Sequence, residues 1–188
     1  MSAPTLIVLA GPNGAGKSTY FKIYLRSAGM LSVNADEITR RIDIPNPEAA
    51  RAADGIRAEL LRSKVSFITE TVFSDPYGAK LQFLRDALAA GYEVRLIFIG
   101  LSSAVLSEAR VIARVRAGGH DVPSERLSRR YEQSLKNLRA ALEFVPDVTV
   151  FDNSSAADPF RLLLRQRNAK PMELAQPFPA WFASVMSQ

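Results

Sequence analysis

Apolar positions along the chain follow two alternating patterns: short continuous runs, and longer segments in which apolar residues are spaced by three or four positions. The short runs are rich in strand-forming residues, as expected of strands buried in a parallel sheet. They predict strands at residues 5–10, 31–34, 66–70, 94–101 and 148–151. The spaced segments predict helices at residues 17–28, 47–64, 77–90, 104–116 and 124–143.

This alternation predicts an α/β fold of three layers, with a mostly parallel sheet between helices. The 188 residues are the size of one domain, so we expect a single domain over 1–188. The last part, residues 155–188, is less regular. We expect an edge strand at 160–166, a loop rich in proline at 171–179, and a short helix at 180–186 that Trp181 anchors to the body.

Composition excludes several classes of protein. Apolar residues make up 47% and charged residues 23%, close to an average soluble globular protein. Cysteine is absent, which excludes disulfides, thiolate metal sites and a cysteine nucleophile, and fits a reducing cytosol. No apolar run approaches 18 residues and no basic segment precedes the first one, so we expect a cytoplasmic protein with neither signal peptide nor membrane span.

The net charge of +5 comes mainly from arginine, which supplies 18 of the 24 basic residues. Guanidinium groups bind phosphate well, so this bias suggests anionic ligands, although solvated helix faces explain most of these side chains. Eight basic residues gather between positions 110 and 139, and Tyr131 is the only aromatic residue among them. Nucleic-acid surfaces usually interleave charge with exposed aromatic residues, so a nucleic-acid partner is disfavoured.

The first predicted strand runs into a phosphate-binding loop. Residues 11–18 match the pattern G-x-x-x-x-G-K-[ST] in the strand–loop–helix context that it requires. Its glycines bring backbone N–H groups close to phosphate oxygens, and the helix N-terminus adds partial positive charge. Lys17 is expected to reach the β- and γ-phosphates of a nucleoside triphosphate, and the Ser18 hydroxyl to bind Mg²⁺. The expected binding residues are Gly11, Pro12, Asn13, Gly14, Ala15, Gly16, Lys17, Ser18 and Thr19.

Other motifs decide which class of nucleotide-binding protein this is. The Asn-Lys-x-Asp motif of GTP-binding switches is absent, and no long apolar strand ends in paired acids as in transporter ATPases. A small kinase instead needs a carboxylate near the acceptor hydroxyl, an acid that organises Mg²⁺, and arginines on a lid over the phosphates. All three have candidates in this sequence.

Two acids follow predicted strands, where parallel sheets gather their ligands. Asp36 follows the second strand and is the candidate general base, with capping of the next helix as the alternative. Glu70 ends the third strand, and with Thr71 after it is expected to hold a Mg²⁺-bound water or the acceptor substrate. A purely structural glutamate is the alternative for Glu70.

Residues 114–130 are expected to form the lid. An arginine-rich helix end is followed by a pair of glycines, a hinge that would let the segment close and exclude water. Arginines on such a segment can stabilise the charge of a transferring phosphoryl group. His120, the only histidine, either contacts phosphate or belongs to the hinge.

Four motifs together resemble the zeta toxin family of P-loop kinases, in its short stand-alone branch. They are the phosphate loop, Val-Asn-Ala-Asp-Glu-Ile around Asp36, Phe-Ile-Thr-Glu-Thr-Val-Phe-Ser around Glu70, and Arg-Val-x-x-Arg-Val-x-x-Gly-Gly-His-Asp-Val-Pro at the lid. The resemblance covers residues 4–154. It implies a five-stranded parallel core in a P-loop NTPase fold, ATP with Mg²⁺, and Asp36 as the base.

The resemblance also implies an acceptor and lid residues. In the toxins proper the acceptor is a UDP-linked N-acetyl amino sugar, and two lid arginines act on the phosphates. Arg114 matches the first arginine. His120 stands near the second, so that Arg129 or Arg130 is the other candidate.

We therefore expect a Mg²⁺-dependent ATP kinase acting on a hydroxyl of a small molecule such as a nucleotide sugar. Two other functions remain open. A kinase directed at polynucleotides or tRNA is suggested by the basic residues near the lid, and a non-catalytic nucleotide-dependent binding module by the departure at the lid. The sequence names neither the acceptor nor an antitoxin partner.

Overall fold

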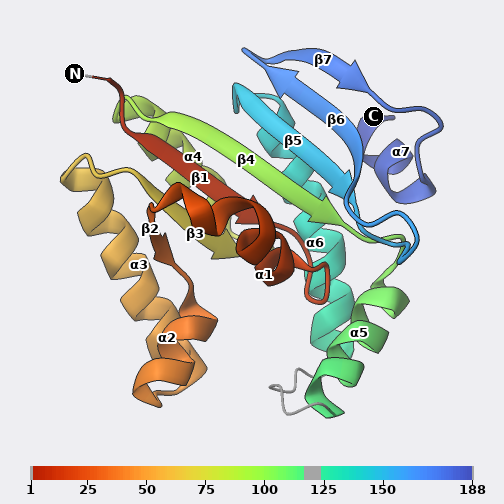
Figure 1. Ribbon diagram of the computed structural model, residues 1–188, viewed down its shortest axis with the longest axis horizontal. Coiled ribbons are helices and arrows are strands. Elements are labelled where there is room, and N and C mark those ends of the chain that lie inside the picture. Colours follow the sequence, from red (N-terminus) through yellow and green to blue (C-terminus); the bar gives the residue numbers. More distant parts are fainter. Residues whose placement is uncertain (1, 117–123, 188) are drawn as a thin grey trace.

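The computed structural model describes residues 2–116 and 124–187, and one seven-stranded sheet runs through them (Figure 1). The strands lie in the order β2-β3-β1-β4-β5-β6-β7. The first five are parallel, and β6 and β7 are antiparallel. The strands are β1 (Thr5–Ala10), β2 (Leu31–Val33), β3 (Phe67–Thr71), β4 (Glu93–Gly100), β5 (Asp147–Asp152), β6 (Arg161–Arg167) and β7 (Lys170–Leu174).

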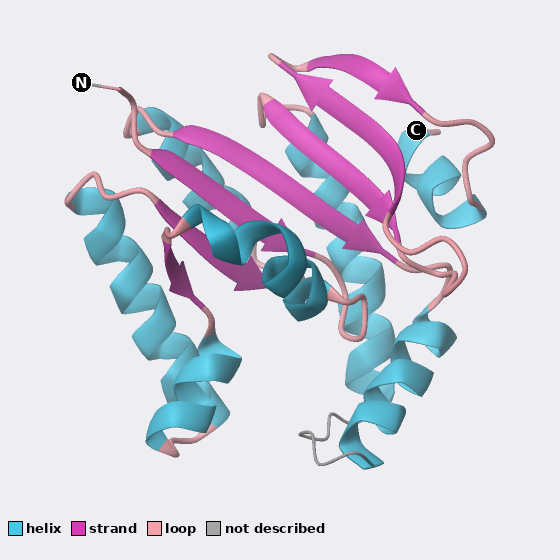
Figure 2. Ribbon diagram, in the orientation of Figure 1, coloured by secondary structure: helices cyan, strands magenta, loops and turns pink. Residues whose placement is uncertain are grey.

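Helices lie on both faces of the sheet, with α1 on one face and α4 and α6 on the other (Figures 1 and 2). The helix after the phosphate loop changes its winding: α1 (Lys17–Tyr20) continues as a π-helical turn over Phe21–Leu25 and a 3₁₀ turn over Arg26–Ala28. The remaining helices are α2 (Ala35–Ile42), α3 (Asn46–Arg62), α4 (Ala79–Ala89), α5 (Ala104–Arg116), α6 (Ser124–Leu142) and α7 (Ala180–Met186). In the described ranges, none of the helices combines the length and hydrophobicity that a membrane crossing needs.

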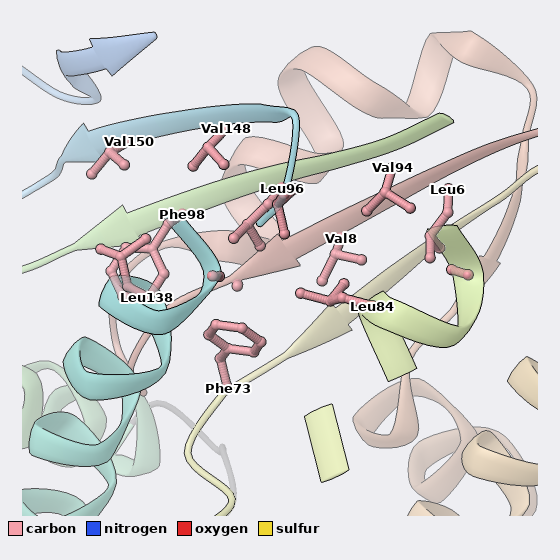
Figure 3. Packing of buried hydrophobic residues seen from close by; sticks show 14 of the residues in the cluster. Leu6, Val8, Phe73, Leu84, Val94, Leu96, Phe98, Leu138, Val148 and Val150 are labelled. Atoms are coloured by element: carbon pink, nitrogen blue, oxygen red, sulfur yellow. The ribbon is translucent and has the colours of Figure 1, made fainter. Parts of the chain in front are cut away.

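The larger core lies between the sheet and the helices α4 and α6 (Figure 3). Alternate residues of the central strands, such as Val8, Leu96 and Phe98, point to this face, where Leu84 of α4 and Leu138 of α6 cover them. Burying each such side chain stabilises the fold by about 1.5–3 kcal/mol. This packing fixes the strands whose carboxyl ends carry the candidate site.

The expected mostly parallel α/β sheet is confirmed, but it has seven strands and not five. The expected loop at 171–179 is wrong because β7 occupies its first half and pairs with β6. The strand expected at 160–166 is therefore not an edge. Asn168 and Ala169 connect β6 to β7 with φ of 50° and 57°, the left-handed pair that a tight hairpin turn requires. Pro171 misled the prediction, although an edge strand tolerates proline.

The C-terminal helix α7 is anchored by Trp181, as the sequence predicted. The Trp181 ring is 5% exposed and lies so close to β4 that a Cβ on Gly100 would be 2.2 Å from it. Its indole Nε1 donates a hydrogen bond of 3.2 Å to Oδ1 of Asp152, at the end of β5. The last helix thereby ties β4 and β5 together near the carboxyl edge of the sheet.

Candidate active site

The phosphate-binding loop joins β1 to α1 with the backbone that its glycines allow. Gly11, Gly14 and Gly16 have φ of 139°, 70° and 92°, where other residues are strained. Gly11 is also required for space, because a Cβ there would lie 2.1 Å from the carbonyl oxygen of Ile99. The loop leads directly into the helix N-terminus at Lys17, an arrangement that binds phosphate groups.

Lys17 is buried beneath this loop. Its ammonium donates hydrogen bonds to the carbonyl oxygens of Gly11 at 2.9 Å and Pro12 at 3.0 Å. Burial lowers the pKa of Lys17, and the nearby carboxylates of Glu70 and Asp36 oppose this shift only in part. An ammonium held by two neutral carbonyls can exchange these partners for phosphate oxygens, which would restore the favourable environment for its charge.

Two other parts of the chain brace the loop. From α5, the Ser107 hydroxyl donates a hydrogen bond of 2.7 Å to the carbonyl oxygen of Asn13. From the segment after β5, Asn153 Nδ2 donates one of 2.9 Å to the carbonyl oxygen of Ala15. Arg110 in turn donates one of 2.8 Å to the backbone oxygen of Asn153. These hydrogen bonds to the loop were not predicted from the sequence. The one indication for Asn153 was its position at the end of a predicted strand.

Glu70 lies at the centre of the site, at the end of β3. The Ser18 hydroxyl donates to both of its carboxylate oxygens, each at 3.2 Å, and Asn34 Nδ2 donates to Oε2 at 2.9 Å. Burial raises the pKa of Glu70, Lys17 and Ser18 oppose this shift, and the negative charge of Asp36 adds to it. The two predicted metal ligands, Ser18 and Glu70, are therefore in contact.

Asp36 stands in the first turn of α2, on the exposed side of the site. The N-cap of this helix is Asn34, whose Oδ1 accepts a hydrogen bond of 2.9 Å from the amide of Asp36. The alternative interpretation, in which Asp36 caps the helix, is therefore wrong. Sequence reasoning overlooked Asn34, which orients Glu70 with one side-chain atom and caps α2 with the other.

The lid candidates are brought together only in part. Arg114, exposed in the last turn of α5, is near enough for its charge to affect the pKa of both Lys17 and Glu70. On α6, Arg130 is half-buried and Arg129 is exposed. His120 lies outside the described residues.

Thr71, the last residue of β3, is the remaining predicted substrate contact. Its hydroxyl accepts a hydrogen bond of 3.1 Å from the amide of Phe73 and so shapes the turn after the strand. On the loop side, Ser18 and Thr19 are exposed at the start of α1. Their hydroxyls are accessible to a ligand.

The arrangement has the composition that phosphoryl transfer needs: a buried ammonium, a hydroxyl, two carboxylates and a guanidinium around one loop. A hydroxyl and a carboxylate in contact also fit Mg²⁺, which takes oxygen ligands and is usually held by one or two carboxylates together with substrate phosphates and water. Within residues 2–116 and 124–187, no group of three or more His, Cys, Asp and Glu side chains is placed to form an all-protein metal cage.

Comparison with known families agrees with this geometry. The profile of one family, zeta toxin, matches residues 1–161. The chain belongs to the zeta toxin family. This member of the zeta toxin family is therefore a P-loop phosphotransferase, that is, a nucleotide-dependent kinase, as its sequence motifs predicted.

Among the known proteins similar to this zeta toxin family member, one matches in sequence and two match in structure. An uncharacterized protein of Haemophilus influenzae is 29% identical over 130 residues, 66% of this chain and 91% of that protein. The structure from the PezAT toxin–antitoxin system of Streptococcus pneumoniae has a TM-score of 0.60 at 17% identity, over 79% of this chain and 68% of that one. The AvrRxo1-ORF1:ORF2 structure with ATP has a TM-score of 0.69 at 17% identity, over 91% of this chain and 60% of that one. At such identities the two structures establish the shared fold.

Proposed function

We propose that the protein is an ATP- and Mg²⁺-dependent kinase that transfers the γ-phosphoryl group to a hydroxyl of a small molecule. The observation that carries this proposal is the convergence of the loop with the ends of β2 and β3. Glu70 bonds to Ser18 on one side and to Asn34 on the other, and Asn34 fixes Asp36. The candidate base, the Mg²⁺ ligands and Lys17 thus share one sheet edge.

Each residue has a role in this proposal. The loop and Lys17 bind the β- and γ-phosphates. Ser18 and Glu70 would hold Mg²⁺, which supplies positive charge against the phosphate oxygens. Asp36 accepts the proton of the acceptor hydroxyl while the hydroxyl oxygen bonds to the γ-phosphorus. The bond from this phosphorus to the bridging oxygen breaks, and ADP leaves.

The segment 114–130 acts as the lid of a single domain in this proposal. Arg114 and Arg130 close over the γ-phosphate, with Arg129 as the substitute for the second position and Thr71 and His120 contacting substrate. The effect of the Arg114 charge on the pKa of Lys17 supports the first of these assignments, because it places the two side chains near each other. Since lid contacts strengthen as charge moves in the transition state, removing Arg114 or Arg130 should lower kcat more than ATP affinity.

The family resemblance suggests an acceptor and a partner to test. A UDP-linked N-acetyl amino sugar is the first acceptor to test, because the family resemblance implies it. The similar structure from Streptococcus pneumoniae comes from a toxin–antitoxin system, so a separate antitoxin protein is a proposed partner.

The test is transfer from labelled ATP to a panel of sugars, nucleotide sugars, nucleosides and RNA. Lys17→Ala should weaken ATP binding in titration calorimetry and abolish transfer. Asp36→Asn should keep ATP affinity within a few-fold and lower turnover by about 10²–10⁴, the range of a positioned base. ATP binding without transfer to any acceptor would contradict the proposed kinase activity. Transfer to RNA alone would show that the acceptor is a nucleic acid and not a small molecule.

A further inference from the structure

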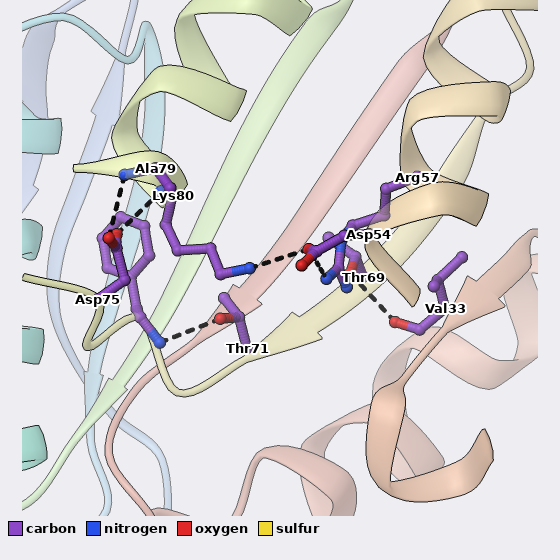
Figure 4. Close-up of polar contacts among 9 residues, drawn as sticks. Val33, Asp54, Arg57, Thr69, Thr71, Asp75, Ala79 and Lys80 are labelled. Carbon is purple, nitrogen blue, oxygen red and sulfur yellow. Dashed lines mark hydrogen bonds and ion pairs between the residues drawn. The ribbon is translucent and has the colours of Figure 1, made fainter. Parts of the chain in front are cut away.

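A second cluster of charge lies across β3 from the phosphate loop, where α3 and α4 cover the strand (Figure 4). Successive side chains of a strand point to opposite faces, so Thr69 and Thr71 point away from the side that Glu70 occupies. There they line a cavity of about 10 Å³, room for about one water molecule. Arg57 of α3 and Lys80 of α4 also line it, and apolar core side chains complete its wall.

The cluster pairs two cations with the carboxylate of Asp54. Arg57 donates to Oδ1 of Asp54 at 2.5 Å, and Lys80 donates to the same oxygen at 3.2 Å. Burial alone would raise the pKa of Asp54, but its hydrogen bonds and charge interactions with Arg57 and Lys80 outweigh this and hold the pKa below its ordinary value. The Asp54 carboxylate is therefore shared by two cations, while the other carboxylate of the cluster, Asp75, accepts from the backbone amides of Ala79 and Lys80.

The positive charge of Arg57 is only partly compensated by its hydrogen-bond partners. The residue is 8% exposed, while the one acidic partner it has among the described residues, Asp54, has a side chain that is 59% exposed. Its other partner is neutral, the Thr69 hydroxyl at 3.1 Å. Within the described ranges these bonds use two of the five guanidinium donors. A buried guanidinium is costly unless it is well paired, so the cluster suits one more anionic oxygen.

A hydrogen bond connects the wall of the cavity to the end of β2, which precedes Asp36. The Thr69 hydroxyl that accepts from Arg57 donates in turn to the carbonyl oxygen of Val33 at 3.1 Å, next to the segment that holds Asp36. Thr69 and Thr71 also flank Glu70 in the sequence. These contacts connect the wall of the cavity to the strand ends that carry Asp36 and Glu70.

We propose that the cavity receives one oxygen of an anionic group on the acceptor, held by Arg57 and Lys80, so that the substrate is a hydroxyl compound bearing a carboxylate or a phosphate ester. The assignment rests on the proposed kinase function and narrows its substrate class. Because the cavity has room for only one oxygen atom, the rest of the anionic group and the reacting hydroxyl would lie outside it.

A binding experiment tests the site without knowledge of the natural acceptor. Protein saturated with AMP-PNP and Mg²⁺, which fill the phosphate loop, is titrated with inorganic phosphate and separately with acetate, while NMR follows the backbone amides of Thr71 and Lys80. Saturable shifts of these amides are expected. Their Kd should rise by about 10-fold or more in Lys80→Gln, the loss typical of a charge-assisted hydrogen bond. Lys170→Gln makes the same change on the exposed strand β7 and should match wild type.

Thermal unfolding checks that Lys80→Gln is folded, and Arg57→Lys gives a second variant that keeps the charge and loses the planar donor fork. Amides that do not shift, or that shift equally in wild type and Lys80→Gln, would overturn the oxyanion site. Comparing the Kd for phosphate with the Kd for acetate shows whether the site prefers a phosphate or a carboxylate group.

A turnover experiment separates this site from the kinase itself. Matched acceptors, gluconate with glucitol and glucose 1-phosphate with methyl glucoside, are offered with labelled ATP. Phosphorylation should favour the anionic member of a pair, and Lys80→Gln should raise its KM about 10-fold with little change in kcat. Equal transfer to both members would overturn the oxyanion site and leave the kinase intact. Absence of ATP binding would contradict the kinase, and the difference in phosphate affinity between wild type and Lys80→Gln would still test the cavity, because Lys80 is not part of the phosphate loop.

Discussion

Asn34 offers a sharp test of how the site is built, because its two side-chain atoms do different work. Oδ1 caps α2 through the amide of Asp36, and Nδ2 orients Glu70, each at 2.9 Å. Asn34→Ala removes both bonds. Asn34→Asp keeps a good capping group and replaces the amide donor with a carboxylate that faces Glu70.

The magnitudes follow from these contacts. Loss of an N-cap costs about 0.5–2 kcal/mol, and loss of a hydrogen bond to a charged group costs about 1.5–3 kcal/mol. Asn34→Ala should therefore lower the free energy of unfolding by roughly 2–5 kcal/mol at neutral pH, where Glu70 is charged. Asn34→Asp should lose a similar amount at neutral pH, because two carboxylates then repel each other. In acid, one of them gains a proton and can donate to the other, so most of this loss should disappear.

Urea denaturation at a series of pH values measures both variants, with ATP turnover followed in parallel. Asn34→Asp should recover most of its stability relative to wild type as the pH falls toward 4, whereas Asn34→Ala should recover less, because its helix cap is missing at every pH. An Asn34→Asp variant as stable as wild type at neutral pH, or one that tracks Asn34→Ala at all pH values, would refute the link between Asn34 and Glu70.

Three further predictions concern the site and its frame. Because burial raises the pKa of Glu70 above its ordinary value of 4.5, its ionisation opposes folding as the pH rises through that window. Glu70→Gln should then have a higher Tm than wild type at pH 7 without nucleotide, and scanning calorimetry should find the difference vanishing near pH 4; a constant difference would contradict the cause given. Gly100→Ala should destabilise the fold by about 3 kcal/mol in urea denaturation, since the new Cβ would lie 2.2 Å from the Trp181 ring; wild-type stability would show that α7 is not anchored there. Burial raises the pKa of Tyr131 to about 12, and its hydroxyl donates to the carbonyl oxygen of Leu101 at 2.8 Å. Tyr131→Phe should cost about 1 kcal/mol, as one hydrogen bond does, and remove a tyrosine titration near pH 12 from the absorbance curve; an unchanged absorbance titration would refute the assignment.

Features carried by neighbouring residues could be predicted from the sequence. The phosphate loop depends on glycines and a lysine within eight positions, and the parallel strands on continuous apolar runs. Asp36 and Glu70 were proposed as site residues because each lies at the carboxyl end of such a run. The hairpin to β7 escaped prediction because Asn168 and Ala169 are an unusual left-handed pair, and because Pro171 indicates a loop unless the strand lies at an edge.

Features that join distant positions were decided only by the tertiary structure. Asn153 braces Ala15 across 138 positions, and Asn34 orients Glu70 across 36. Arg57 and Lys80 look like ordinary residues of solvated helix faces until α3 and α4 place them over the same carboxylate. Local pattern determines which segments become strands and helices, because it acts through the backbone of neighbours. Which side chains meet at the end of a strand depends on how the sheet orders β2, β3 and β1, and no local pattern contains that order.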